Sequence, residues 1–386
     1  MNVKKYGFIY VSAMLCAAVL FFNAKDDVRK INPPNLDSAH LGKKIICHRP
    51  MRRGAPNMSV EVRDNKIVAH NYGHGGSGWT LGPGSADYVI NLLISNEHAK
   101  ELEKDTPIAI IGAGVLGLFS AYTLEKMGFT NIRIIADKFE DLTSHNAGGL
   151  LAPCSMDNDP TMQKVIDQIG IDAYRFYESI AKKKHKDFKE GSAIVPAYFE
   201  NSKNSGLEPY VGVVMQPAKD VVLDFGNGTT RKMVAYDDGI FIDTAKMMAN
   251  LNAYIKSKKI KCVQKEVHSF EEIEEKFIIN CSGLGAENLN KDSSVISVQG
   301  HLVMLKDQNP AELQHMILVY FDKAKTKSGH NVKRSFYIFP KHLDNTGIND
   351  VGVIGGTFIE GANEDTPNIE EFEILLNGAK NFYGIQ

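Results

Sequence analysis

The alternation of apolar and polar residues along the chain predicts a protein of mixed α/β class. Short apolar runs that suit buried strands lie at 106–111, 132–136 and 277–281. Between the first two runs, residues 113–127 have the spacing and composition of a helix. Strands that alternate with helices in this way favour a parallel sheet covered by helices, so the middle of the chain is predicted to form such a unit.

The remaining segments add further helices and a second group of strands. Helical spacing predicts helices at 85–102, 160–186, 244–257 and 370–382. Strand-like runs are predicted at 44–47, 59–62, 297–306, 335–339 and 351–358, and as short pieces between turns from 191 to 243. A chain of 386 residues exceeds one small domain, so we expect two or three lobes.

Composition is that of an ordinary globular protein. Apolar residues make up 43% and charged residues 23%, and the formal net charge is −2. This balance gives no reason to expect nucleic acid or an anionic membrane surface as a partner. The five cysteines form no CxxC pair and no Cys/His cluster, so neither a metal site nor a disulfide framework is expected; they are Cys16, Cys47, Cys154, Cys262 and Cys281.

The first 25 residues have a different pattern. Lys4 and Lys5 precede an apolar run from Gly7 to Phe22, after which the chain becomes polar. A basic start followed by an apolar run of this length indicates a secretion signal or a short membrane anchor, and a buried N-terminal helix is the alternative. We therefore expect an exported protein, periplasmic or secreted, or one that contacts a membrane only through its N-terminus.

A glycine-rich turn joins the first strand to the helix that follows it. It reads Gly112-Ala113-Gly114-Val115-Leu116-Gly117. Its first glycine permits the tight turn, its second lets the backbone approach a pyrophosphate, and its third lets the helix pack closely on the sheet. The helix N-terminus offers free N–H groups and a positive dipole end to phosphates. Asp137 ends the next strand, where a ribose hydroxyl needs an acceptor. The motif predicts a Rossmann-like dinucleotide site without deciding between FAD and NAD.

Several other segments resemble the D-amino-acid oxidase family. Residues 136–150 resemble its second FAD segment, where an acidic-basic pair meets the ribose and a Thr/Ser-rich loop lines the pyrophosphate and flavin. Residues 264–272 resemble the segment that brackets the adenine, and Ile279-Asn280-Cys281-Ser282-Gly283 resembles a strand-turn near FAD. Tyr337-Ile338-Phe339-Pro340 and Gly355-Gly356-Thr357-Phe358 resemble two strands of the family's substrate lobe.

Two stretches that resemble the C-terminal signatures of that family precede the glycine-rich turn. They are His48-Arg49-Pro50-Met51-Arg52 and the run from His70 to Thr80, which contains Gly73-His74-Gly75-Gly76-Ser77-Gly78. The chain itself ends soon after Lys380-Asn381-Phe382, where the family would continue into the first of these signatures. We therefore interpret the segment order as circularly permuted. Such a change can preserve every packing contact, since only the covalent connections move.

The resemblance implies a fold and a division into domains. The fold would be a Rossmann-like FAD-binding domain plus a mixed β-sheet substrate domain. The implied division is a signal peptide or anchor at 1–24, a linker at 25–43, an FAD-binding domain at 44–160 plus 261–300, and a substrate domain at 161–260 plus 301–386.

The resemblance also implies an activity, the oxidative deamination of a D-amino acid. A hydride passes from the substrate α-carbon to flavin N5, oxygen then reoxidises the flavin to give hydrogen peroxide, and the imine hydrolyses to a keto acid and ammonia. No metal is required. Arg49 would bind the substrate carboxylate with its guanidinium fork, Tyr337 would bond the same carboxylate, and the Gly76 carbonyl would take the ammonium. From local sequence alone, Arg49 would be read as a surface residue and Tyr337 as a packing residue.

Cofactor contacts are implied at many positions. Those expected to hold FAD are Gly112, Ala113, Gly114, Leu116, Gly117, Asp137, Lys138, Thr143, Ser144, Gly148, Gly149, Leu150, Val267, Ser282, Gly75, Gly76, Ser77, Gly78, Trp79 and Thr80.

The sequence departs from the family at the substrate gate. Lys333 stands where the family usually carries a lid tyrosine, four residues before Tyr337. One hypothesis is that Lys333 recognises an acidic substrate side chain, and the alternative is a solvated lysine on a loop. Two other functions remain open: a membrane-linked dehydrogenase of the same family that reduces a quinone, and a catalytically silent FAD-binding protein.

Overall fold

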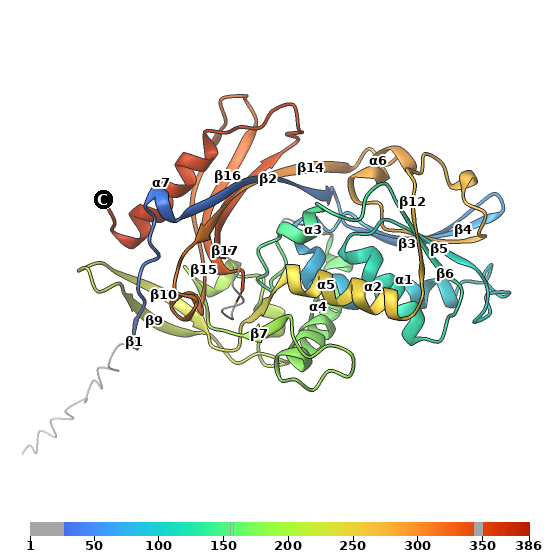
Figure 1. Cartoon of the computed structure of the whole chain (residues 1–386), viewed down its shortest axis with the longest axis horizontal. Coiled ribbons are helices and arrows are strands. Elements are labelled where there is room, and N and C mark those ends of the chain that lie inside the picture. Colours follow the sequence, from blue (N-terminus) through green and yellow to red (C-terminus); the bar gives the residue numbers. More distant parts are fainter. Residues whose placement is uncertain (1–26, 155, 157, 343–349) are drawn as a thin grey trace, which may run out of the picture.

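The computed structural model describes residues 27–154, 156, 158–342 and 350–386. In this part of the chain a six-stranded and a nine-stranded sheet lie side by side (Figure 1). The expected signal or anchor falls within residues 1–26 and lies outside the described residues. Within the described ranges, no helix is long and apolar enough to cross a membrane.

The six-stranded sheet has the order β12-β6-β5-β13-β4-β3. All its neighbouring strands are parallel except β3 and β4, which form an antiparallel hairpin. The fully buried apolar strands β5 and β13 take the two central positions, as their composition favours. The strand bounds are β3 (Asn57–Arg63), β4 (Lys66–Tyr72), β5 (Ile108–Ile111), β6 (Ile132–Ala136), β12 (Lys261–Gln264) and β13 (Phe277–Asn280).

Four long helices pack around this sheet (Figure 1). They are α1 (Gly78–Ile94), α2 (Val115–Lys126), α4 (Pro160–Ala181) and α5 (Thr244–Ser257). The first begins earlier than the predicted 85–102, because its Gly and Pro residues are used for packing. A Cβ at Gly82 would lie 2.7 Å from the Phe119 ring, so α1 can approach α2 closely. Pro83 interrupts the helical hydrogen bonding, and the Trp79 carbonyl instead accepts a 2.8 Å bond from the Tyr177 hydroxyl.

The nine-stranded sheet has the order β1-β9-β10-β8-β15-β16-β17-β14-β2 and mixes parallel with antiparallel pairs. Helix α7 (Glu371–Tyr383) packs on one face, which we call the back face, and the opposite face, which carries Arg49 and Tyr337, is the site face. The strands are β1 (Val28–Lys30), β2 (Leu41–Arg52), β8 (Ala197–Phe199), β9 (Lys219–Asp224), β10 (Thr230–Tyr236), β14 (Val295–Lys306), β15 (Met316–Lys325), β16 (Asn331–Pro340) and β17 (Asp350–Glu360).

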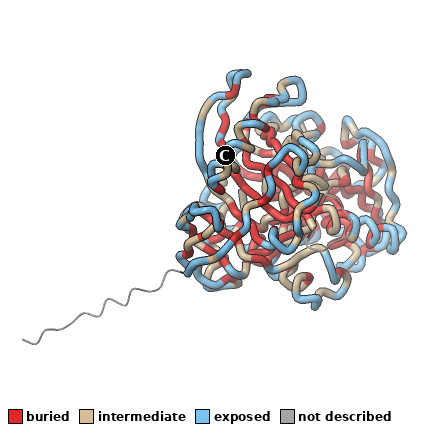
Figure 2. The backbone as a smooth tube through the Cα atoms, turned by 60° about the vertical axis from the view of Figure 1, so that its left-hand side comes forward, coloured by how far each residue is buried: buried red, intermediate tan, exposed pale blue. Residues whose placement is uncertain are grey.

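Smaller elements complete the chain. Strands β7 (Ser192–Ile194) and β11 (Ile240–Ile242) form a two-stranded ladder, and α3 (Thr143–Asn146) and α6 (Ala286–Leu289) are single turns. Figure 2 shows buried backbone running through the middle of the molecule, with exposed segments at its periphery. A parallel α/β unit beside a mixed sheet confirms the predicted fold class.

The predicted linker at 25–43 contains structure. Strand β1 pairs in parallel with β9, and Ile31 and Leu36 are buried in the core beneath the sheet. Arg29 fixes this strand through ion pairs to Asp27 and Asp237. Isolated apolar residues in a Pro-rich stretch gave no periodic signal for a strand of three residues. The division into domains remains a prediction; of its FAD-binding part, β2 lies in the nine-stranded sheet and β3 to β6, β12 and β13 in the other.

Candidate active site

The turn between β5 and α2 is too crowded for any residue larger than glycine at two positions. Gly112 has φ +106°, and a Cβ there would lie 2.3 Å from the Cys281 carbonyl oxygen. A Cβ at Gly117 would lie 2.0 Å from the Gly112 carbonyl oxygen. The helix therefore starts directly against the strand, and the N–H groups of its first turn are the kind of donor that a phosphate site uses.

The loop that follows β6 ties this turn to the N-terminal part of the chain. The Ser144 hydroxyl accepts a 3.0 Å bond from the Val115 N–H at the start of α2, and its carbonyl accepts a 2.8 Å bond from the Trp79 indole. The Thr143 hydroxyl donates to the His48 carbonyl at 3.2 Å. These bonds bring residues expected around a pyrophosphate next to the strand that carries Arg49.

The same loop then passes close to the site face. A Cβ at Gly148 would lie 2.8 Å from the Phe339 ring and 3.5 Å from that of Tyr337. At Gly149, where φ is +95°, a Cβ would lie 2.2 Å from the Ile242 carbonyl oxygen, and Leu150 bridges to Phe241. Glycine at both positions is needed for the backbone to pass between the rings of Phe339 and Tyr337 on one side and β11 on the other.

The glycine loop between β4 and α1 lies beside the end of β2. His74 forms an isolated antiparallel β-bridge with Met51, which lies two residues beyond Arg49. Gly75 and Gly76 come directly after His74 and therefore lie close to the end of β2. The Ser77 hydroxyl bonds both the N–H and the carbonyl of Cys154, at 2.7 and 2.8 Å. Thr80 donates to the Ala152 carbonyl, so Ser77, Gly78, Trp79 and Thr80 are all held against the loop that follows β6.

Two buried polar side chains at this loop lack a hydrogen-bonding partner. Asn71 is fully buried with both amide atoms unpaired, and His74 is fully buried with both ring nitrogens unpaired. Burial lowers the pKa of His74 to about 3, so its imidazole is neutral at physiological pH. Unpaired buried polar groups are costly, which indicates that a polar molecule meets this loop.

The predicted adenosine contacts lie at the carboxyl ends of neighbouring strands. Asp137 and Lys138 are exposed directly after β6, and the Asp137 carbonyl accepts a 3.0 Å bond from Gln264 at the end of β12. Val267 packs against the buried cluster beside β12. Ser282 follows β13, where its N–H and hydroxyl both donate to the Asn280 side chain. The predicted residues thus share one edge of the sheet, where ligands of such folds bind.

Arg49 is a buried cation on the site face. It is 8% exposed, its Nη1 donates to the Thr357 carbonyl at 3.0 Å, and its Cζ lies 4.6 Å from the centre of the Phe358 ring. A Cβ at Gly300 would lie 2.5 Å from both Nη atoms, so the guanidinium rests on bare backbone. Within the described part of the chain, no carboxylate forms an ion pair with Arg49.

The pKa of Arg49 reflects this setting. Burial is the largest single effect and acts to lower the pKa, but Cys47, Tyr337 and Cys154 together outweigh it, so the pKa is raised. Because burial raises the pKa of the Tyr337 phenol, Tyr337 supplies a hydrogen-bonding atom but no counter-charge near neutral pH. Arg49 is therefore a permanently charged group with no anionic partner among the described residues.

Tyr337 meets Arg49 as the sequence implies. Burial raises the pKa of its phenol and Arg49 opposes this, so the hydroxyl keeps its proton and remains a hydrogen-bond donor at neutral pH. The ring stacks on Phe339, with centres 4.4 Å apart and planes 8° apart. A Cβ at Gly355 would lie 2.2 Å from the hydroxyl oxygen, so glycine on β17 leaves the space that this side chain fills.

Two thiols beside Arg49, and a tyrosine near one of them, were not identified from the sequence. Cys47 and Cys154 each influence the pKa of both Arg49 and Tyr337, so both thiols lie at the site. Cys47 has a recognisable signal, because it lies two residues before Arg49 on the same face of β2. Tyr320, on β15, has a raised pKa through burial and the proximity of Cys154. Tyr320 pairs with Ser335, two residues before Tyr337, and the sequence does not show this register.

Lys333 lies further out on the site face. It pairs across the ladder with Phe358, whose ring covers Arg49, and its amino group lies 3.8 Å from Glu360. Its side chain is 64% exposed, so it borders the site at the rim. No group of three or more metal-binding side chains occurs in the ranges that the structure describes.

Comparison with known proteins adds a family. The model of the family described as FAD dependent oxidoreductase (DAO) matches residues 107–385, which is well over half of the chain. The chain belongs to this FAD-dependent oxidoreductase family. The region before residue 107, which supplies Arg49 and the glycine loop, lies outside the match.

The similar proteins share modest identity with the chain. Human D-aspartate oxidase is 25% identical over 213 residues, which is 52% of this chain and 59% of the relative. The chain thus matches about three fifths of that relative's length. Several solved structures are similar to this chain. L-proline dehydrogenase from P. horikoshii is 13% identical, with 72% of this chain and 79% of that chain covered and a TM-score of 0.45. The same values are 16%, 70%, 78% and 0.47 for iminodiacetate oxidase from Chelativorans sp. BNC1, and 14%, 72%, 79% and 0.49 for glycine oxidase from Bacillus cereus ATCC 14579.

The family's cofactor, FAD, fits the described residues. The crowded glycines at 112 and 117 open the start of α2 to a pyrophosphate, and Asp137 lies at the neighbouring strand end for a ribose. The unpaired side chains of Asn71 and His74 lie at the other end, towards Arg49. The cofactor prediction is confirmed by the family, and the individual contact residues remain predictions that the structure gathers along one path.

Proposed function

We propose that the chain catalyses the FAD-dependent oxidation of a D-amino acid to an imine, which water converts to a keto acid and ammonia. The observation that carries this proposal is Arg49, a buried guanidinium with no carboxylate partner among the described residues, facing the phenol of Tyr337. A buried charge without a partner costs several kcal/mol, so a protein that keeps one in a site gains from an incoming anion.

The site binds and orients a carboxylate through the two groups that face it. The guanidinium fork offers parallel N–H donors, of which one Nη1 hydrogen is used by the Thr357 carbonyl, and Tyr337 adds an O–H donor. The Gly76 carbonyl is the proposed acceptor for the substrate ammonium, as the resemblance implies. When bound, FAD accepts the hydride that leaves the substrate α-carbon. Phe358 and the Tyr337–Phe339 stack exclude water from the guanidinium and so strengthen its bonds.

An acidic substrate side chain is a finer proposal. Human D-aspartate oxidase acts on D-aspartate by its name, and Lys333 supplies a cation at the rim of this chain's site face. Glu360 competes for that cation at 3.8 Å, which is a loose contact between exposed groups. Turnover of D-aspartate relative to D-alanine should fall in Lys333→Ala and stay unchanged in the remote control Lys232→Ala. An unchanged ratio in Lys333→Ala would remove this proposal.

Molecular oxygen is the proposed electron acceptor. The purified protein, loaded with FAD and supplied with air and its best D-amino acid, should form hydrogen peroxide and keto acid in equal amounts. Keto acid without peroxide, and only when a quinone is added, would replace oxygen by a quinone. Neither peroxide nor keto acid with any D-amino acid, with or without a quinone, would show that the site does not oxidise D-amino acids.

The circularly permuted order is also a proposal. Its support is that the family match starts at residue 107, whereas β2 and β4 before it are strands of the nine-stranded and six-stranded sheets and α1 packs in the core between them and the other helices. The start of β2 lies near α7, because the Lys44 amino group is 5.6 Å from the Phe372 ring centre. A chain that begins at residue 103 and carries residues 27–102 after Gln386, through a short linker, should therefore fold and bind FAD. A colourless, unfolded product would contradict the proposal.

Export or anchoring through residues 1–26 is proposed from their sequence alone. Fractionation of cells that express the full chain, with and without this segment, tests it. The full chain should appear outside the cytoplasm or in the membrane fraction, and the shortened chain should remain in the cytoplasm. Identical distribution of the two would remove the proposal.

A further inference from the structure

Strands β16 and β17 pair irregularly next to Tyr337, one of the residues proposed to bind the substrate. Arg334 lies opposite Thr357, but the next pair is Tyr337 opposite Gly355, so two residues of β16 face the single Gly356 of β17. Gly356 has φ +143°, and a Cβ there would lie 1.9 Å from the Ser335 carbonyl oxygen. Such a bulge re-aims neighbouring side chains and is held only if its flanking residues are held.

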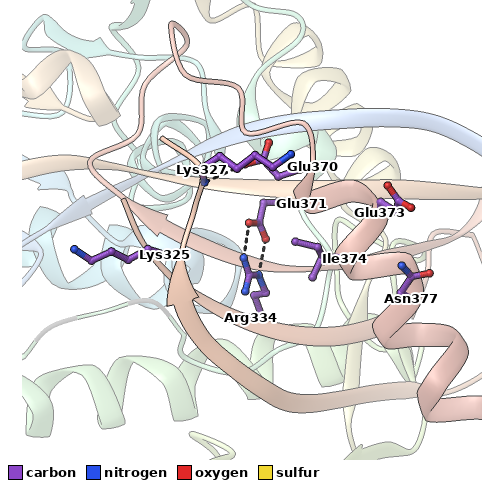
Figure 3. A pocket seen from close by; sticks show the side chains of 8 residues that line it. All are labelled: Lys325, Lys327, Arg334, Glu370, Glu371, Glu373, Ile374 and Asn377. Carbon is purple, nitrogen blue, oxygen red and sulfur yellow. Dashed lines mark hydrogen bonds and ion pairs between the residues drawn. The ribbon is translucent and has the colours of Figure 1, made fainter. Parts of the chain in front are cut away.

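The last regular pair before the bulge points to the back face, away from the substrate. Arg334 is 7% exposed there and donates to both carboxylate oxygens of Glu371, at 2.7 Å each, and to Asp322, also at 2.7 Å. Figure 3 shows this fork beneath the first turn of α7, in the wall of a charged cavity of about 340 Å³. Two parallel charge-assisted bonds to a fully buried carboxylate fix both position and orientation of β16.

Thr357, the partner of Arg334, is fixed in the same way on β17. Its hydroxyl accepts the His301 backbone N–H and lies 2.8 Å from His301 Nδ1. The other ring nitrogen, Nε2, lies 2.8 Å from the Pro367 carbonyl, which can only accept, so Nε2 carries the proton and Nδ1 accepts from the hydroxyl. The His301 ring also packs edge-on against Phe372 of α7, 4.8 Å away. Each polar side-chain atom of Thr357 and His301 therefore has a hydrogen-bonding partner.

Thr357 connects the site face of the sheet with its back face. The Thr357 carbonyl accepts the bond from Arg49, while its hydroxyl is bound by His301. We infer that Thr357 and His301, together with the Arg334–Glu371 ion pair, are positioning residues that hold the bulge so that Arg49 and Tyr337 converge on the substrate carboxylate. The inference rests on the proposed function only in naming a carboxylate as the ligand. It assigns a role in substrate binding to the start of the C-terminal helix, which does not touch the site.

The test uses the FAD-loaded full chain and sodium acetate as the simplest carboxylate, followed by the visible spectrum of the flavin. Thr357→Val keeps the shape of the side chain and removes only the hydroxyl. It should weaken acetate binding by about tenfold, the effect of losing roughly one buried hydrogen bond behind Arg49. KM for the best D-amino acid should rise by a similar factor, with kcat changed less than about twofold, because the reacting atoms are untouched. Thr357→Ser restores the hydroxyl and should restore both constants.

A matched control separates positioning from general destabilisation. Thr326→Val removes a buried hydroxyl in the same sheet, at the hairpin that joins β15 and β16, where it bonds His330 and Ser328. It should lower stability without changing acetate affinity. Wild-type acetate affinity in a folded, FAD-loaded Thr357→Val protein would overturn the inference. If that variant fails to bind FAD, Glu371→Gln provides the same test from the other side of the bulge. Loss of response to all D-amino acids with intact acetate binding would instead refute the proposed function alone.

Discussion

Arg49→Met tests directly whether the buried guanidinium of Arg49 serves to bind the substrate carboxylate. Methionine retains the length and apolar contacts of the arginine stem and removes the charge. In the wild type the guanidinium has one carbonyl bond at 3.0 Å, one aromatic contact at 4.6 Å and no carboxylate partner among the described residues. Two charge-assisted bonds to a substrate carboxylate contribute about 3–6 kcal/mol in total, so carboxylate affinity should fall roughly 10²- to 10⁴-fold.

The effect on stability should be small, which distinguishes a ligand-binding residue from a structural one. Losing the bond to Thr357 and the contact with Phe358 costs about 2–4 kcal/mol. Removing an uncompensated buried charge returns a similar amount, about several kcal/mol. We therefore expect the free energy of unfolding of the apo-protein to change by less than about 2 kcal/mol in either direction.

Acetate titration of the flavin spectrum and urea unfolding of the apo-protein measure the two effects in the same variant. Arg49→Lys is the control, because it keeps the charge and loses the planar fork, and its affinity should lie between those of wild type and Arg49→Met. Acetate affinity within about twofold of wild type in Arg49→Met would refute the assigned role. A loss of more than about 4 kcal/mol in stability would show instead that Arg49 is a structural residue.

Three further predictions concern the cofactor turn, the phenol and a buried histidine. Gly117→Ala places a methyl 2.0 Å from the Gly112 carbonyl oxygen, so FAD affinity, measured by quenching of flavin fluorescence, should fall more than about tenfold; unchanged affinity would contradict the reading of the turn. Tyr337→Phe should raise KM about tenfold with a smaller change in kcat, and an unaltered KM would exclude the hydroxyl from carboxylate binding. Because burial lowers the pKa of His74 from 6.5 to about 3, the unfolded chain takes up a proton first, and stability is complete above pH 6.5 and lost as pH falls towards 3. Apo His74→Leu should therefore lose about 2 kcal/mol less than wild type between pH 6.5 and about 5 in urea unfolding, and equal losses would refute the burial of a neutral imidazole.

Local pattern predicted the elements whose apolar residues follow a clear run or period. Strand 132–136 and helix 244–257 have the predicted bounds, because one is apolar except for Arg133 and the other has a capping Asp243 before a periodic face. Helix α1 was placed too late because Gly82, Pro83 and Gly84 argue against a helix in isolation. Their use is tertiary: they allow α2 and α4 to approach, which no local pattern records.

The site divides in the same way. The turn at 112–117 was predicted from the residues themselves, because the strand, the glycines and the helix that form it are contiguous in the sequence. Arg49 and Tyr337 were placed together only through a family resemblance, because almost three hundred residues separate them and their ladder includes a bulge. Tyr320 and Cys154 were missed, since register across three strands and a loop decides their position.

The central claim is that a D-amino acid binds against Arg49 and reduces the flavin. Anaerobic mixing of the FAD-loaded protein with matched D- and L-amino acids, followed by the visible absorbance of oxidised flavin, tests it most directly. The account predicts rapid loss of that absorbance with at least one D-amino acid, none with its L-enantiomer, and none in Arg49→Met. Persistence of the oxidised spectrum with every D-amino acid, or equal bleaching by both enantiomers, would contradict it.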